Sequence, residues 1–494
     1  PETTIYKAAI VASKTFKEKK IDWSEYNQGL VTTYTQNEKV ADRSVVRTVG
    51  NRLTKNELPA LGMAQEPYIL EYEGYIHIKE VGSFQLLLDD PSRMLPDIQI
   101  GATTIRYITP SYRPKPNQLL PVMSLPLGLH KFKISKLSMT PEKDYAFKLK
   151  WQWEGKALEP ISPELFFHKP TPELKESLAL RKGRELVGSK QCTACHTTDL
   201  ENNKGMPELW ERAPNLNNVG SRLNESWMQE WLLSPKALRH SANMPSLFKG
   251  DKQAAANVAA YLSTLGEKSG HLGLGSDKIK NGGALFNDLG CIACHSSPNK
   301  LKQVEGRLSL GMISSKYQPK ALVDFLLKPE ANHKDTRMPN FALSRKEAES
   351  LAVFLMAESS KVQTIQGGLK GQPAEGKKLV SKMGCANCHQ LDQTSKVNAP
   401  KLASLGGSSA NCKQVDYTLS KDETDSIKLA LGNVKSFNQH IKTESAQRAI
   451  ERLNCAACHT RDNASDLWSK FANETSQWKV EHAQVLSQKD FAFF

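Results

Sequence analysis

The five-residue pattern Cys-x-x-Cys-His constrains this chain more than any other feature, because it occurs four times in 494 residues. A composition with nine cysteines and twelve histidines would produce about 0.004 such patterns by chance. We number the copies motifs one to four. They are Cys192, Cys195 and His196; Cys291, Cys294 and His295; Cys385, Cys388 and His389; and Cys455, Cys458 and His459.

This pattern indicates a specific chemistry. Two thiols at this spacing add to the two vinyl groups of a haem, and the adjacent histidine takes one axial position on the iron. A thioredoxin-like redox pair and a zinc site built from Cys-x-x-Cys pairs are the alternatives, but neither explains a histidine after every pair. The sequence therefore predicts four covalently bound haem c groups, with His196, His295, His389 and His459 as iron ligands.

Two methionines are candidates for the opposite axial position. Met244 and Met338 lie 48 and 43 residues after the preceding motif histidine, and a proline follows each. A thioether ligand raises the potential of haem iron relative to a second imidazole. We predict that Met244 and Met338 complete the haems of motifs one and two, with His240 and His333 as alternatives. A methionine that only fills a core is the competing interpretation.

Motifs three and four lack this option, because Met383 is the last methionine of the chain. We expect their sixth ligands among His440, His482 and Cys412, although such residues are more often surface histidines or inert buried thiols. An open sixth position is the remaining alternative, and it would permit catalysis.

The chain is long enough for several separate cores. Up to about residue 170 it has no cysteine and consists of short alternating or apolar stretches between glycines and prolines, which favours a β-sandwich or barrel. Two adjacent strands are expected over 74–90, and further strands over 98–108, 128–134 and 145–153. Helices and loops alternate from about residue 173. The predicted fold class is therefore multidomain, with an all-β sandwich followed by all-α modules.

The predicted domains follow these changes of pattern. They are a helical segment at 1–27, the sandwich at 28–170, a first module at 175–268, a second module at 277–362, and a region at 372–494 that carries motifs three and four. Only 35 residues follow His459, too few for a separate domain, so the last two haems are expected to share one domain.

The modules repeat several sequence features. Each has a glycine nine residues before its first haem cysteine, at Gly183, Gly282 and Gly376, and glycine allows two helices to cross closely. Ala-Pro-x-Leu occurs after motif one and again after motif three, beginning at Ala213 and Ala399. The ends of modules one and two also match, with Trp231 aligned to Phe325 and Tyr261 to Phe354.

These spacings, over roughly 175–465, resemble class I cytochromes c and the haem-binding regions of large multidomain c-type cytochromes of planctomycete-like bacteria. The resemblance implies electron transfer and names no donor or acceptor.

The N-terminal part resembles a PA14 domain, a β-sandwich that binds glycans or acts as a spacer. The resemblance rests on Gly29-Leu30, Gly74-Tyr75-Ile76, Phe84–Asp90, Gly128-Leu-His and the segment from Trp151 to Phe167. Adhesin members bind calcium through adjacent aspartates, and Asp89-Asp90 match that position, although Pro91 stands where glycine is commoner. A turn shaped by these aspartates is the competing interpretation.

Composition limits the surroundings and partners. No apolar run approaches the ~20 residues that cross a bilayer, and haem c is attached outside the cytoplasm, so we expect a periplasmic or exported cell-surface protein whose signal peptide has been removed. A net charge of +14 is spread along the chain, which suits a solvated surface or steering toward an acidic redox partner. Nucleic-acid binding is not expected, since no binding motif accompanies this charge.

These features favour an electron-transfer protein over an enzyme. Four haems would relay electrons between redox partners, such as a periplasmic dehydrogenase or a membrane oxidoreductase. One alternative is a peroxidase or sulfur-compound oxidoreductase that uses the haem of motif three or four, although no distal histidine–arginine pair is visible. The other is a surface protein whose PA14-like domain binds glycans or mediates assembly.

Overall fold

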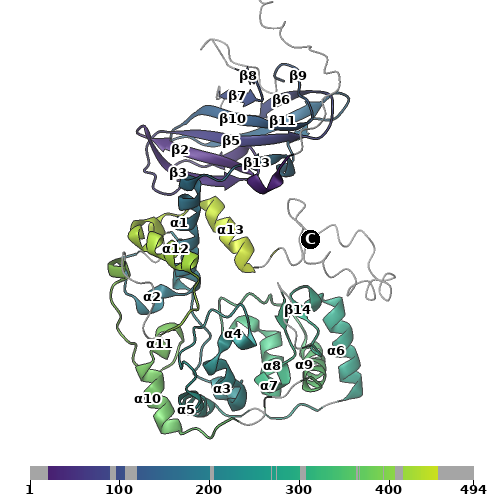
Figure 1. The fold of residues 1–494 in the computed structure, drawn as a ribbon. Helices are drawn as coiled ribbons and strands as arrows, with labels where there is room; N and C mark the ends of the chain where they lie inside the picture. Colours follow the sequence, from purple (N-terminus) through teal and green to yellow (C-terminus); the bar gives the residue numbers. More distant parts are fainter. Residues whose placement is uncertain are drawn as a thin grey trace, which may run out of the picture. The chain divides into compact units, whose positions relative to one another are not determined.

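A computed structural model describes residues 21–89, 96–105, 119–200, 205–268, 270–273, 275–300, 307–362, 365, 368–392, 394–405, 415–453 and 455 (Figure 1). These residues form two compact units. The first comprises the chain up to Arg181 together with Gln439–Thr443, and the second comprises Lys182–Asn438 and the residues from Glu444 onward. Most of the helical segment predicted at 1–27 lies outside the described residues, and Trp23–Glu25 form a short 3-10 turn.

The first unit contains two antiparallel sheets. One has the strand order β1-β13-β5-β10-β7-β8, with β2 beside β5 and β3 beside β2, and the other has the order β12-β11-β6-β9, with β4 beside β11. The strands are β1 (Asn27–Gln28), β2 (Leu30–Gln36), β3 (Lys39–Val46), β4 (Gly50–Leu53), β5 (Tyr68–Ile78), β6 (Ser83–Asp89), β7 (Asp97–Ile100), β8 (Thr103–Ile105), β9 (Met123–Ser124), β10 (Gly128–Met139), β11 (Tyr145–Trp153), β12 (Glu159–Pro160) and β13 (Phe166–His168).

The two sheets share one core, as alternating sequences predict. Along β11 every second residue is buried, and the strand has the bounds that the sequence predicted. Tyr72 and Ile76 of β5 meet Phe84 and Leu86 of β6 in this core. The two strands expected next to each other over 74–90 therefore lie in different sheets, because their apolar faces pack against each other across the core. The predicted all-β fold, followed by helices, is confirmed.

The second unit is mainly helical. Its helices, and the two that begin in the first unit, are α1 (Pro172–Ser189), α2 (Cys192–Cys195), α3 (Glu225–Leu233), α4 (Pro235–Leu238), α5 (Lys252–Ser263), α6 (Ser276–Asp288), α7 (Ile313–Lys316), α8 (Pro319–Leu327), α9 (Arg345–Ser360), α10 (Pro373–Lys382), α11 (Cys385–Cys388), α12 (Lys421–Gly432) and α13 (Lys442–Leu453). Within the described part of the chain, none of the helices combines the length and apolar character that a membrane span requires.

Three glycines set the helix crossings in this unit. A Cβ atom on Gly183 would lie 1.9 Å from the Ser426 oxygen, one on Gly282 2.1 Å from the Ser350 oxygen, and one on Gly376 1.9 Å from the Asn257 oxygen. The prediction that these glycines allow close helix crossings is confirmed. The crossing pairs are α1 with α12, α6 with α9, and α10 with α5 (Figure 1).

Only the pair α6 and α9 joins the helix before a motif to the helix that closes the same module. The helix that follows Met244, α5, crosses α10, which precedes motif three. The helix before motif one crosses α12, more than two hundred residues further along the chain.

Candidate haem-binding sites

Each of the three described motifs begins immediately after a residue with left-handed backbone geometry. These residues are Gln191, Gly290 and Gly384, with φ angles of 54°, 65° and 72°. This conformation ends the preceding helix and starts a new short turn. The paired cysteines of motifs one and three occupy the single-turn helices α2 and α11, whereas in motif two Cys291 begins a 3-10 turn, Cys291–Ala293, and Cys294 caps its end.

The histidines of motifs one and three are oriented by backbone carbonyls. His196 Nδ1 lies 2.7 Å from the oxygen of Pro400, and His389 Nδ1 lies 2.7 Å from the oxygen of Pro214. A carbonyl can only accept, so Nδ1 donates in both pairs and Nε2 keeps its lone pair. Metal-bound histidines in proteins are held in this way. The residues present therefore fit a haem iron at Nε2 of each imidazole.

These carbonyls are exchanged between the two motifs. Pro214 follows motif one in the sequence but accepts from the histidine of motif three, and Pro400 follows motif three but accepts from the histidine of motif one. Backbone hydrogen bonds repeat the exchange: Ala213 N donates to Cys388 O at 3.2 Å, Leu216 N to Gln390 O at 2.9 Å, and Leu402 N to Thr197 O at 2.8 Å.

Three sites are defined by these contacts. The first site contains motif one, α1, residues 399–402 and α12. The second contains motif two, α6, residues 308–311, α8 and α9. The third contains motif three, α10, residues 213–216, α3 and α5.

Met244 packs in the third site. It contacts an apolar cluster that includes Val380 and Ala386, from the helix before motif three and from motif three itself. Trp231 Nε1 donates a hydrogen bond to Met244 Sδ at 3.0 Å. The sequence predicted Met244 as the partner of His196, whereas the structure groups it with the residues around His389. The reason is that α5, which follows Met244, packs against α10, and residues 213–216, which precede Met244, bond to motif three and the residue after it.

The second site uses neighbouring segments only. Leu308 N donates to Cys294 O at 2.8 Å, which corresponds to the contact of Ala213 in the third site. Met338 contacts the core formed by α6, α8 and α9, where the Phe286 and Phe354 rings lie 5.7 Å apart. Burial lowers the pKa of His295 to about 4, so this imidazole is neutral and able to act as a ligand.

Motifs one and three contact each other directly. The helices α2 and α11 contact each other, and the interaction of the Cys195 and Cys388 thiols lowers the pKa of Cys195 to about 7 and raises that of Cys388. Asn387 Nδ2 donates to Ala194 O at 3.3 Å. The second cysteines of motifs one and three, Cys195 and Cys388, are therefore neighbours.

Motif four is described only at its first cysteine. Cys455 follows α13, and α13 joins the first site through the buried ion pairs of Glu444 with Arg184 at 2.6 Å and with Arg448 at 2.7 Å. Cys458 and His459 lie outside the described residues, as do His482 and Cys412.

The other candidate histidine ligands occupy different surroundings. His240 is exposed, and His440 is exposed and belongs to the first unit. His333 is half-buried, and its charge adds to the burial that lowers the pKa of His389. None of the contacts described brings His333 to Met338 or to motif two.

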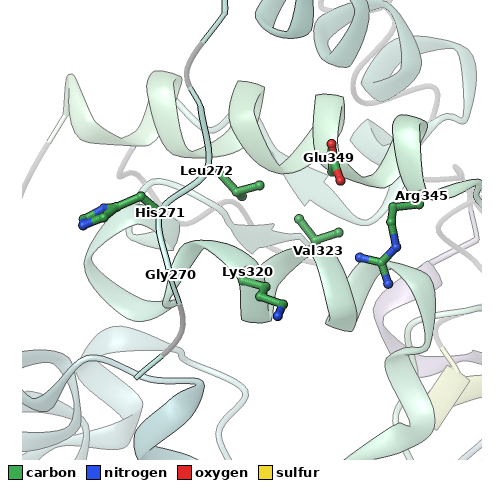
Figure 2. A pocket seen from close by; sticks show the side chains of 7 residues that line it. All are labelled: Gly270, His271, Leu272, Lys320, Val323, Arg345 and Glu349. Carbon is green, nitrogen blue, oxygen red and sulfur yellow. The ribbon is translucent and has the colours of Figure 1, made fainter. Parts of the chain in front are cut away.

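Two further surface features lie outside these sites. Asp89 pairs with Lys150 Nζ at 2.8 Å, while Asp90 lies outside the described residues, and no three metal-ligating side chains gather in the described part of the chain. A hollow of about 240 Å³ is lined by Leu272 and Val323 together with the charged Lys320, Arg345 and Glu349 (Figure 2). It contains no motif residue, and we assign it no cofactor.

Comparison with known families identifies part of this arrangement. Residues 180–266 match the family model Cytochrome c. This stretch includes motif one, Ala213–Leu216 and Met244, so the chain carries a cytochrome c module, and such domains bind haem c covalently and transfer electrons. The matched stretch is continuous in sequence, but the structure divides it between the first and third sites. A search of curated proteins found no match.

Solved structures share similarity with about a third of the chain. An anti-sigma factor domain-containing protein from Clostridium clariflavum has 15% identity and a TM-score of 0.24 over 29% of this chain, which spans 48% of that protein's length. The PA14 domain of the MpAFP antifreeze protein has 10% identity and a TM-score of 0.23, covering 32% of this chain and 99% of that domain. The PA14 sugar-binding domain from an RTX adhesin has 12% identity and a TM-score of 0.20, covering 28% and 98%.

The sequence did not reveal the functional roles of several residues. The Pro214 and Pro400 carbonyls were signalled by the repeated Ala-Pro-x-Leu, but nothing in that repeat indicated which histidine each would hold. In the sequence Trp231 is only an aromatic residue aligned with Phe325, and its indole N–H is the available signal for a contact with Met244.

Proposed function

We propose that the chain is a tetrahaem c-type cytochrome that relays electrons between redox partner proteins. The observation that carries this proposal is the pair of motif histidines whose Nδ1 atoms are bound by carbonyls, which leaves both Nε2 atoms available to iron. The second motif has its own core and methionine, and the fourth has the same sequence pattern. Haem supplies reversible one-electron transfer, while the protein sets each potential through the axial ligands and burial.

A periplasmic or cell-surface location is part of this proposal, because haem c is attached outside the cytoplasm. The net charge of +14 supports association with an acidic partner, such as a dehydrogenase or a membrane oxidoreductase. Association of this kind should weaken as ionic strength rises.

Haem stoichiometry tests the proposal. The mass of the denatured holoprotein should exceed that of the polypeptide by four haems, and peptide mapping should place one at each motif. A mass increase of three haems, with Cys455 and Cys458 free, would remove the fourth site. A spectroscopic redox titration should then show four one-electron steps.

We further propose that the β-sandwich docks the cytochrome on a glycan or a partner. An open depression of about 470 Å³ is lined by polar residues that include Asn51, Arg52 and Asp89 and by the apolar Ala146 and Phe147. Glycan-array binding by the full-length protein, lost on Asn51→Ala and Arg52→Ala substitution, would support glycan recognition. Binding that these changes leave intact would place recognition elsewhere.

A haem enzyme is the second candidate function, and one observation favours it. The described residues that complete the first site, 399–402 and α12, include neither methionine nor histidine. An open coordination position there would give a high-spin spectrum that responds to cyanide or peroxide. Fully low-spin haems that ignore both reagents would exclude this candidate and favour electron transfer alone.

A further inference from the structure

We propose that the haems of motifs one and three form an intertwined pair, in which Met244 is the sixth ligand of the haem on Cys385 and Cys388. The haem on Cys192 and Cys195 then takes no methionine. This inference rests on the proposed function and adds the ligand assignment and the neighbour of each haem.

Helix packing gives the first argument. In the second site, which is continuous in sequence, the helix before the motif crosses the helix after the methionine, and a Cβ atom on Gly282 would lie 2.7 Å from Phe354 Cβ. In the third site a Cβ atom on Gly376 would lie 2.8 Å from Tyr261 Cβ, and Tyr261 lies on the helix after Met244. Met244 thus occupies, in the third site, the place that Met338 has in the second.

The histidine contacts give an independent argument. The carbonyl of Pro214 holds His389, and Pro214 lies on the chain segment that leads to Met244. The segment that holds His196 leads from Pro400 to α12 and contains no methionine. The hydrogen bond between His389 and Pro214 and the crossing of α5 with α10 therefore both connect Met244 to motif three.

Contact between the motifs makes the two haems neighbours. Asn387 Nδ2 of motif three donates to Ala194 O of motif one at 3.3 Å, and the short helices that carry the two cysteine pairs, α2 and α11, contact each other. Two haems held through thioethers to the cysteines of α2 and α11 would therefore be neighbours. Oxidation of one iron adds positive charge beside the other, so each midpoint potential should depend on the redox state of its neighbour.

Cross-linking of the unmodified holoprotein tests the exchange without any substitution. Lys401 Nζ lies 3.4 Å from Asp199 Oδ1, and both side chains are exposed. A zero-length carbodiimide should join these residues, as mass spectrometry of the digest would show. The pair Lys278–Glu349, 3.1 Å apart within the second site, is the control. Recovery of the control link without the Asp199–Lys401 link would overturn the exchange.

Haem removal tests the ligand assignment. In the full chain, Cys385→Ala with Cys388→Ala should abolish one of two methionine-to-iron charge-transfer bands and one shifted ¹³C-methyl methionine signal. Cys192→Ala with Cys195→Ala should keep both bands, while either change should shift the midpoint of the remaining partner haem. The Met338 band reports that the second site still folds. Loss of a methionine signal with motif one instead would contradict the assignment, as would unshifted midpoints.

Haem count separates this inference from the proposed function. Mass spectrometry of the unmodified protein must first show haem at motifs one and three. A disulfide between Cys195 and Cys388 in place of the thioethers would refute both the function proposed for these motifs and the pair. If haem is present at both motifs but the methionine signal is lost when the cysteines of motif one are replaced, only the intertwined pair is refuted.

Discussion

The second and third sites are built from the same kinds of parts but obtain them differently. Both combine a glycine-bearing helix, a haem motif, a loop against the motif, and a methionine before the closing helix. The second site takes all of them in sequence order within 276–360, whereas the third takes its helix and motif from 373–389 and the rest from 213–263. A local motif thus specifies the kind of part that a segment supplies, and long-range packing decides which site receives it.

Leucine at the crossing glycines should have the largest effects. Because a Cβ at each position would lie within about 2 Å of a backbone oxygen, Gly183→Leu, Gly282→Leu and Gly376→Leu should each destabilise one helix pair by roughly 3 kcal/mol. Gly376→Leu should remove the Met244 charge-transfer band and Gly282→Leu that of Met338. Gly183→Leu should spare both bands. If Gly183→Leu removed the Met244 band, the comparison between the sites would fail.

Methionine replacement tests whether the two methionine sites are equivalent. Met244→His and Met338→His should each lower one midpoint potential, because a second imidazole stabilises ferric iron more than a thioether does. The other midpoint potentials should be unchanged, and one near-infrared methionine-to-iron band should disappear in each variant. Unchanged titrations would show that neither methionine binds iron.

The closing helices α9 and α12 offer a matched pair of smaller changes. Each begins with a capping box, formed by Ser344 with Glu347 and by Ser420 with Glu423. Removal of the serine side chain by alanine substitution should cost about 1 kcal/mol in each case. Chemical denaturation followed at individual haem bands should show that Ser344→Ala lowers the free energy of unfolding of the second site. Ser420→Ala should lower that of the first site. Weakening of the third site by Ser420→Ala would contradict the exchange.

Trp231 distinguishes the two methionines electronically. Its indole N–H donates to Met244 Sδ, while the aligned residue near Met338 is Phe325, which has no donor. Trp231→Phe should make Met244 a better donor to ferric iron and lower that midpoint modestly, with no change at the second site. A redox titration measures both, and Phe325→Tyr serves as a control that retains an aromatic ring at the second site.

Acidification should affect both capping boxes slightly. Hydrogen bonds with Ser344 lower the pKa of Glu347, and those with Ser420, aided by Lys190 and Lys182, lower the pKa of Glu423. A lowered folded-state pKa stabilises the protein above the ordinary carboxyl pKa, and this contribution disappears as pH falls through the folded value. Unfolding measured below about pH 4.5 should therefore depend less steeply on pH in Ser420→Ala and Ser344→Ala than in the unmodified chain.

Sequence patterns predicted the parts of this molecule better than their combination. The motif cysteines, the strand Tyr145–Trp153 and the crossing glycines follow from chemistry and periodicity that are visible locally. The exchange was not predictable, because His196 and His389 are held by backbone carbonyls, which every residue has. Two similar Ala-Pro-x-Leu segments could serve either histidine equally well, so only the packing of the helices around them settles the choice.

The exchange also orders the assembly of the protein in time. His196 and Pro400 are separated by 204 residues, and the whole second site lies within the loop that their contact closes. Contacts so distant in sequence form slowly compared with local ones, although the entropy of closing the loop rises only gradually with its length. If the chain emerges N-terminus first, the second site would be complete before residues 373–402, which the first and third sites require, have emerged. Motif one, the first to emerge, would then be among the last to be enclosed.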